Sequence, residues 1–214
     1  MGDAMVITPR IISLLIGYFC GSILTAEIVA GKYAGTSASK LGDTGNPGMA
    51  NIMASLGFVP GIITLAGDIG KCIVAVVLAY IFFHEAGSII CLYAGLGCTI
   101  GHDFPFWRKF RGGKGVATTS IALVLFSFTL GLLANIAGML VVFATKYLCM
   151  GGPVIPLAFA VFMFMKGNAE ASWIGILLTI LSVKAHFSSM QGIRTGRTKK
   201  VDVIAAIKKK FFHV

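Results

Sequence analysis

Long apolar stretches separated by short polar loops run through most of the chain. A membrane-crossing helix needs about 20 consecutive apolar residues. The stretches that approach or exceed this length are Ile11–Ala30, Gly57–Phe83, Ala86–Ile100, Val116–Ala144, Leu148–Met165 and Ser172–Val183. Val116–Ala144 is long for one tilted crossing and short for two. The pattern predicts an all-α fold, a polytopic helical bundle integral to a membrane.

The composition excludes an ordinary soluble domain. Apolar residues make up 57% of the 214 residues and charged residues only 12%, about half the charged share of a soluble domain, roughly 25%. The cysteines lie in apolar stretches without a C-x-x-C pair, so we interpret them as small buried hydrophobes. No disulfide framework, metal site or other cofactor is expected.

The placement of positive charge predicts how often the chain crosses the membrane. Lys and Arg gather in three segments, the loop after Ala30, the loop 101–115 and the segment from Lys184 onward. Cytoplasmic loops carry an excess of Lys and Arg. If all three segments are cytoplasmic, Val116–Ala144 either makes no crossing or forms two short helices, and we favour the two helices. This gives about seven transmembrane helices, with the N-terminus outside and the C-terminus in the cytoplasm.

The net charge of +10 is thus assigned to membrane topology, and no nucleic acid partner is expected. We predict one domain, 1–214, whose residues 184–214 form a basic cytoplasmic tail. Within that tail, Val201–Phe212 has the pattern of a basic amphipathic segment. This pattern has two equally good interpretations. The segment either rests on anionic lipid or is a frayed end of the chain.

The first polar loop, Lys40–Asn51, contains the run Thr44-Gly45-Asn46-Pro47-Gly48. Glycines permit left-handed backbone, and proline stiffens the turn between them. Such turns can direct successive N–H groups at one anion, while Thr44, Asn46 and Asn51 add neutral hydrogen-bonding groups. An ordinary turn is the alternative, and the residues alone favour neither.

The second polar loop, Gly101–Thr118, places Gly112, Gly113 and Gly115 around Lys114 just before a predicted helix. A helix N-terminus with glycine amides and an ammonium group suits a phosphate. The nucleotide-binding P-loop pattern fails, because Arg108 and Gly115 stand where it needs glycine and Ser or Thr. A positive cytoplasmic loop with interfacial aromatic residues explains the charges but leaves the glycines unexplained.

Several ionisable residues lie within or beside the predicted spans. Asp68 and Lys71 share one helix face, which predicts an internal ion pair or, alternatively, the polar path of a small-anion transporter. Glu27, near a membrane end, is expected to reach toward the interface. His102 and His186 are candidate site residues. A hydrolase nucleophile elbow, G-x-S-x-G, is absent from the sequence.

Taken together, these motifs resemble the bacterial acyl-phosphate:glycerol-3-phosphate acyltransferases, the PlsY-type family. The resemblance covers most of the chain. It is carried by Tyr18-Phe-Cys-Gly-Ser22, by Thr44-Gly-Asn-Pro-Gly48 with Asn51, by Asp68 and Lys71, by Gly101-His-Asp-Phe-Pro105, and by Phe110-Arg-Gly-Gly-Lys-Gly-Val-Ala-Thr118.

The resemblance implies a seven-helix enzyme of the plasma membrane with its site on the cytoplasmic face. It would transfer a fatty acyl group from acyl phosphate to the 1-hydroxyl of glycerol 3-phosphate, without metal or coenzyme A, at the lipid bilayer. The implied catalytic residues are Thr44, Lys114 and His186. The implied substrate-binding residues are Gly45, Asn46, Gly48, Asn51, His102, Gly112, Gly113 and Ser189. Acyl-chain preference and oligomeric state are not implied.

The chain departs from the family pattern at four polar positions. A phosphate-binding Arg of the family is replaced by Ala54, an Asn by Ser189, a second Arg by Gly192 and a Glu by Thr198. These changes leave a second hypothesis open, a catalytically weakened relative that binds lipid phosphates or an acyltransferase partner. We expect Thr44, Asn46, Lys114 and His186 to converge on one cytoplasmic pocket.

Overall fold

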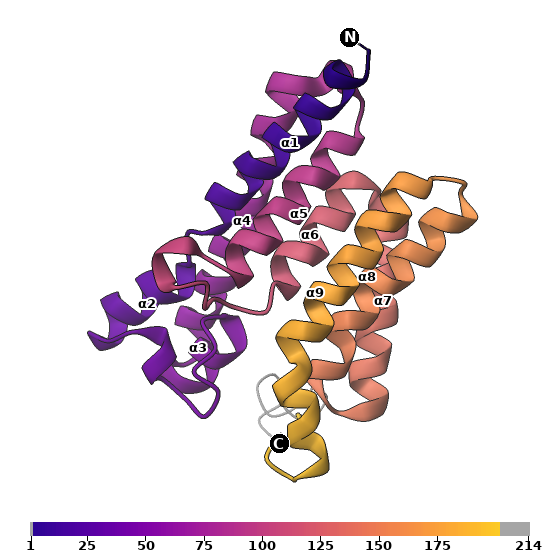
Figure 1. Cartoon of the computed structure of the whole chain (residues 1–214). Helices are drawn as coiled ribbons and strands as arrows, with labels where there is room; N and C mark the ends of the chain where they lie inside the picture. The colour runs from indigo at the N-terminus through magenta and orange to yellow at the C-terminus, as the bar shows by residue number, and fades with distance from the viewer. Residues whose placement is uncertain (1, 202–214) are drawn as a thin grey trace. The chain divides into compact units, whose positions relative to one another are not determined.

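The computed structural model describes residues 2–201, which are helical with short connections and contain no strand within that range. Its α-helices are α1 (Gly2–Gly21), α2 (Thr25–Ala34), α3 (Met49–Leu56), α4 (Phe58–Phe83), α5 (Ile89–Asp103), α6 (Val116–Phe126), α7 (Phe128–Thr145), α8 (Leu148–Met165) and α9 (Ala169–Arg194) (Figure 1). The all-α prediction is confirmed.

The helices group into two compact units, Met1–Gly131 and Leu132–Val214, with the division inside α7. In the described part of the chain, six helical segments are long and apolar enough to cross a membrane, and α6 is a shorter apolar helix. Together these seven segments agree with the predicted helical bundle. The exact number of crossings and the placement of the termini stay predictions.

The first predicted span is broken in the middle, between α1 and α2. The break exposes backbone carbonyls that water cannot satisfy inside a bilayer. The indole Nε1 of Trp107 donates to the Ser22 carbonyl at 2.7 Å, and Lys71 Nζ donates to the Ile23 carbonyl at 2.9 Å. Two side chains distant in sequence therefore stabilise the break.

Helices α1 and α5 pack with their backbones in contact. Modelling a Cβ atom at Gly17 or Gly21 of α1, or at Gly97 or Gly101 of α5, would bring it into backbone atoms of the other helix. Small residues spaced four apart allow this close approach in membrane helices. The pairing fixes the end of α5, and hence the second polar loop, against the first helix.

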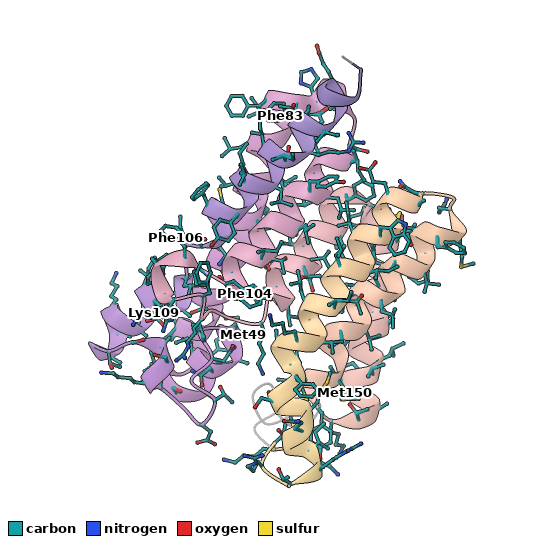
Figure 2. All side chains as sticks on the ribbon, viewed as in Figure 1. Met49, Phe83, Phe104, Phe106, Lys109 and Met150 are labelled. Atoms are coloured by element: carbon teal, nitrogen blue, oxygen red, sulfur yellow. The ribbon has the colours of Figure 1, made fainter. Side chains whose placement is uncertain are left out.

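The order of the helices places both polar loops at one end of the first unit. Helix α4 leads away from α3, and α5 returns toward the second polar loop. Figure 2 shows Phe83, at the end of α4, far from Met49, Phe104 and Lys109. The loops are thus on the same side of this unit, as the charge pattern predicted.

The uncharged stretch Val116–Ala144 forms two helices, α6 and α7, which meet at Ser127. Gly131 lies so close to the Leu123 backbone that a Cβ atom would overlap it. The short turn depends on this close approach. The prediction of two helices is confirmed.

In the second unit, α8 packs against α7 and α9 through small residues. Gly151 of α8 meets Gly138 of α7, and Gly175 of α9 meets Ala160 of α8. The Ser172 hydroxyl donates to the Ala160 carbonyl at 2.9 Å, and the Asn168 side chain caps α9 by accepting from the Ala171 N–H.

The end of α9 differs from the prediction. The helix runs to Arg194 rather than stopping near Val183, and His186 and Gly192 within the extension are buried. Hydropathy ended the span early because the extension carries exposed polar residues such as Lys184 and Ser188 as well as the buried His186. The following segment returns to the α7–α8 turn, where the Val201 N–H donates to the Lys146 carbonyl at 2.8 Å. The remainder of the predicted amphipathic segment Val201–Phe212 lies outside the described residues.

Candidate functional site

Asn51 organises the first polar loop. Its side-chain amide donates to the Ala38 carbonyl at 3.3 Å and to the Leu41 carbonyl at 3.0 Å. Its Oδ1 accepts the hydroxyl hydrogen of Thr44 at 3.1 Å. Both donors of this buried side chain are therefore used within the protein. Asn51 shapes the loop rather than presenting a free amide to a ligand.

The first polar loop then leads directly into α3. Gly45 has φ +56° and lies against the Ser39 carbonyl, a place where a side chain would be strained and crowded. Gly48 is the N-cap of α3 and supplies no side-chain cap. The first N–H groups of a helix have no partner within it, so the loop presents a helix N-terminus beside Thr44 and Asn46.

Glu27 joins the two polar loops. Its Oε1 forms an ion pair with the Arg108 guanidinium of the second polar loop. Its Oε2 accepts the N–H of Ala38 at 3.1 Å, in the 3₁₀ turn Ala38–Lys40 that leads into the first polar loop. The carboxylate is about 15% exposed, and its expected reach toward the interface stays a prediction.

Behind the second polar loop, the Lys71 ammonium has two hydrogen-bond partners and one ion-pair partner. They are the Ile23 carbonyl, Asp68 Oδ1 at 2.9 Å and His102 Nδ1 at 2.8 Å. Because Lys71 can only donate, His102 Nδ1 must accept, which places the imidazole proton on Nε2. Asp68 and Lys71 thus form the predicted internal ion pair, extended by His102.

Gly112 and Gly113 pack directly on His102. A Cβ atom at Gly113 would overlap the imidazole, and one at Gly112 would overlap the His102 carbonyl. Their N–H groups donate at 2.9 Å to the carbonyls of Asp103 and His102, respectively. These two amides therefore close the loop onto α5, and the substrate-binding role expected for Gly112 and Gly113 stays a prediction.

The part of the second polar loop that meets α6 retains the features of an anion site. Gly115 is the N-cap of α6 with φ +63°, and no side chain caps the helix there. Lys114 is half-buried immediately before it. The helix N-terminus and the adjacent ammonium both favour an anion.

Asp103 is the unusual neighbour of this helix start. It is 4% exposed, and neither carboxyl oxygen has a hydrogen-bond partner among the described residues. Its Oδ1 lies 2.8 Å from the position a Cβ atom would take at Gly115. The carboxyl group thus occupies the space that a side chain at Gly115 would need.

The remaining predicted residues belong to the second unit. His186 is 3% exposed, and its Nδ1 donates to the Ser182 carbonyl at 2.9 Å, so Nε2 is the acceptor nitrogen of the neutral ring. The ring packs on Gly152. Ser189 contributes its carbonyl, which accepts the Thr198 hydroxyl at 2.7 Å.

Two of the unusual substitutions fit each other. A Cβ atom at Gly192 would overlap the Thr198 hydroxyl, and the Thr198 N–H donates to the Gly192 carbonyl at 3.1 Å. A small residue at one position makes room for the other. Ala54, by contrast, is exposed on α3.

The structure therefore brings part of the predicted site together. Thr44, Asn46 and Asn51 share the end of the first unit with Lys114, linked through Glu27. Convergence with His186 stays a prediction. Sequence reasoning missed Glu27 and Asp103, because a single acidic residue near a span end carries no signal of its partners.

Comparisons with known proteins agree with this architecture. The family model described as glycerol-3-phosphate acyltransferase matches residues 11–196. The chain is 38% identical to glycerol-3-phosphate acyltransferase 1 of Lactobacillus johnsonii, covering 93% of this chain and 96% of that protein. It is 31% identical to the glycerol-3-phosphate acyltransferase of Coxiella burnetii, covering 89% and 97%.

Two solved structures share the fold. Both are of PlsY, an integral membrane glycerol 3-phosphate acyltransferase. The glycerol 3-phosphate form has a TM-score of 0.79 at 23% identity, covering 92% of this chain and 98% of that one. The lysophosphatidic acid form has a TM-score of 0.75 at 22% identity, covering 89% and 94%. The chain is a multi-pass membrane protein and belongs to the glycerol-3-phosphate acyltransferase family.

Proposed function

We propose that this protein transfers a fatty acyl group from acyl phosphate to the 1-hydroxyl of glycerol 3-phosphate, at the cytoplasmic face of the plasma membrane. The product is 1-acylglycerol 3-phosphate. The observation that carries the proposal is the pair of helix N-termini, α3 and α6, at the ends of two polar loops that Glu27 joins. Family membership supports the same reaction.

The reaction needs little covalent chemistry from the protein. The hydroxyl oxygen of the acceptor bonds to the carbonyl carbon, the bond from that carbon to the phosphate oxygen breaks, and the hydroxyl proton passes to phosphate. Acyl phosphate is already activated, so no protein nucleophile is required. Holding the two reactants in line supplies much of the acceleration.

Both substrates carry a phosphate, and the two loops offer two positions for anions. Lys114 and the start of α6 would hold one phosphate and stabilise the charge on the leaving group. The first polar loop and the start of α3 would hold the other, with Gly45, Asn46 and Gly48 letting it approach the backbone. Thr44 and Asn51 keep that loop in shape.

His102, Gly112 and Gly113 support the site from behind in this proposal. The imidazole is held by Lys71 on one side and covered by Gly113 on the other. It therefore fixes the path of the loop that carries Lys114. His186 and Ser189 stay proposed site residues of the second unit, and His186 Nε2 is the proposed proton acceptor there.

The direct test measures acylated product from acyl phosphate and glycerol 3-phosphate with protein purified in a lipid mimic. Lys114→Ala should lower kcat/KM by about 100-fold or more, since it removes charge stabilisation at the leaving phosphate. Lys109→Ala removes an equal charge from an exposed position of the same loop and should retain activity. Equal rates for Lys114→Ala and the wild type would contradict the proposal.

Ala54→Arg tests whether the lost family arginine limits this protein. The exposed position on α3 leaves room for the side chain, and a charged hydrogen bond contributes about 1.5–3 kcal/mol. We therefore expect a lower KM for at least one substrate, by roughly tenfold or more. An unchanged KM for both would show that other groups of this chain already supply that cation.

A further inference from the structure

Glu27 contacts both the second polar loop and the 3₁₀ turn that leads into the first polar loop. It lies in the first turn of α2, directly after the break in the first span. One carboxylate oxygen pairs with Arg108 and the other accepts from the Ala38 N–H at 3.1 Å. One oxygen thus contacts the second polar loop, and the other contacts the turn that leads into the first polar loop.

On the side of the first polar loop, the contact continues toward the candidate anion site. The Ala38 residue whose N–H is bound by Glu27 also accepts, through its carbonyl, from the Asn51 amide at 3.3 Å. Asn51 in turn accepts the Thr44 hydroxyl at 3.1 Å. A displacement of Glu27 is therefore transmitted through Ala38 and Asn51 to Thr44.

On the side of the second polar loop, Arg108 follows Trp107 in one 3₁₀ turn, Phe106–Arg108. The Trp107 indole is fixed to the Ser22 carbonyl at 2.7 Å. The chain then turns back through Gly112 and Gly113, whose N–H groups bond to the end of α5. The pair between Arg108 and Glu27 thus holds the start of the segment that carries Lys114 against α2.

The Glu27 contacts are poorly explained by folding stability alone. Both partners of the ion pair are about 15% exposed, and in a mostly buried pair the cost of removing two charges from water offsets much of their attraction, so its net contribution to folding is small. A bimolecular transfer, by contrast, depends steeply on the separation of its two bound reactants. The geometry therefore favours a role in spacing the loops.

We propose that Glu27 is a positioning residue for acyl transfer, one that holds the two polar loops at a fixed separation so that the two substrates meet in line. This inference rests on the proposed function. In this role the Glu27 side chain touches neither substrate and acts only through Ala38 and Arg108.

The two contacts can be separated by substitution. Glu27→Gln keeps an oxygen that can accept from the Ala38 N–H but loses the charge that pairs with Arg108. The double change Glu27→Arg with Arg108→Glu restores an ion pair, but a guanidinium has no acceptor for the Ala38 N–H. Glu27→Ala removes both contacts. Glu85→Gln, an exposed carboxylate at the opposite end of the first unit, is the matched control.

Hydrogen–deuterium exchange gives a readout that does not depend on turnover. We expect faster exchange in peptides covering residues 104–115 for Glu27→Gln, in residues 38–48 for the charge swap, and in both for Glu27→Ala. Glu85→Gln should match the wild type. Unchanged exchange in both loops of Glu27→Ala would overturn the inference, whether or not the protein is active.

Kinetics then test the positioning role. All three Glu27 variants should lose about 10- to 100-fold in kcat/KM, while inhibition by inorganic phosphate stays within twofold of the wild type, because each loop still binds its anion. A Glu27→Ala enzyme with wild-type kcat/KM would overturn the positioning role. A wild-type protein that forms no product would instead overturn the proposed function, and the exchange data would still decide whether Glu27 links the loops.

Discussion

Asp103 shows how a single buried carboxyl group can oppose folding at a functional site. Neither of its oxygens has a hydrogen-bond partner among the described residues, although it is almost fully buried. Burying a charged or polar group without such a partner costs free energy. The start of α6 nearby compensates only in part, because a helix N-terminus contributes about 0.3–1 kcal/mol to a nearby negative charge.

We therefore expect Asp103→Asn to raise the thermal midpoint of unfolding. The substitution keeps the shape and prevents ionisation at a place where burying a charge costs more than burying a neutral polar group. Thermal unfolding in detergent measures the change, with the exposed Asp43→Asn as the control. A lower midpoint for Asp103→Asn would show that the native carboxylate is satisfied by a partner such as an ordered water.

Gly113 gives a second expectation at the residue scale. A methyl group there would overlap the His102 imidazole, and overpacking of this kind costs about 1–3 kcal/mol. Gly113→Ala should lower both the unfolding midpoint and the acyl-transfer rate, since the loop carrying Lys114 must shift. Gly31→Ala is the matched control, because nothing lies within 4 Å of its Cβ position. Equal stability of the two variants would contradict this packing account.

The residue types of the candidate site could be predicted, but their roles could not. The sequence indicated an anion site from the glycines of the two polar loops, the Lys114 ammonium and the side-chain amides of Asn46 and Asn51. The two loops do lie at one end of the first unit. The sequence could not indicate that Gly112 and Gly113 use their N–H groups on the carbonyls of α5. Hydrogen-bond direction depends on the tertiary path of the backbone, which no local pattern encodes.

At the scale of elements, the break between α1 and α2 depends on Lys71. Its ammonium serves the Ile23 carbonyl, Asp68 and His102 together. Removing one partner of a buried ion pair leaves the other charge uncompensated, at a cost of about 3–5 kcal/mol. Lys71→Met should therefore destabilise the protein strongly.

The double variant Asp68→Asn with Lys71→Met distinguishes the cost of an unpaired buried charge from the cost of losing the donor at the helix break. It should recover part of the lost stability, because no buried charge remains unpaired, while the Ile23 carbonyl still lacks its donor. Thermal unfolding of the single and double variants gives the comparison. Equal destabilisation of the two would show that the break, rather than the charge, accounts for the loss.

Most helices could be predicted from hydropathy, while their interruptions could not. The residues of the break, Ser22, Ile23 and Leu24, differ little in polarity from a continuous span, and the donors that stabilise it come from distant elements. The extension of α9 past Val183 was missed for a related reason. Polar residues such as His186 lower a hydropathy average even where a helix continues.

At the scale of the whole molecule, the prediction concerns membrane sidedness. Lys40 and Lys109 lie on the polar loops at one end of the first unit, and Glu85 lies at the other end, after α4. With Cys introduced singly at these positions, a membrane-impermeant maleimide should label Lys40→Cys and Lys109→Cys from the cytoplasmic side and Glu85→Cys from the outside. Labelling of Lys40→Cys and Lys109→Cys from opposite sides would contradict the proposed site.

The glycine contacts between α1 and α5 have a consequence for how substrates enter and leave. Because the two backbones interlock at Gly17, Gly21, Gly97 and Gly101, neither helix can slide along the other without a steric clash. Helix α1 and the end of α5 therefore form a rigid helix pair. Any opening of the first unit toward the lipid or the cytoplasm must leave the contact between α1 and α5 intact.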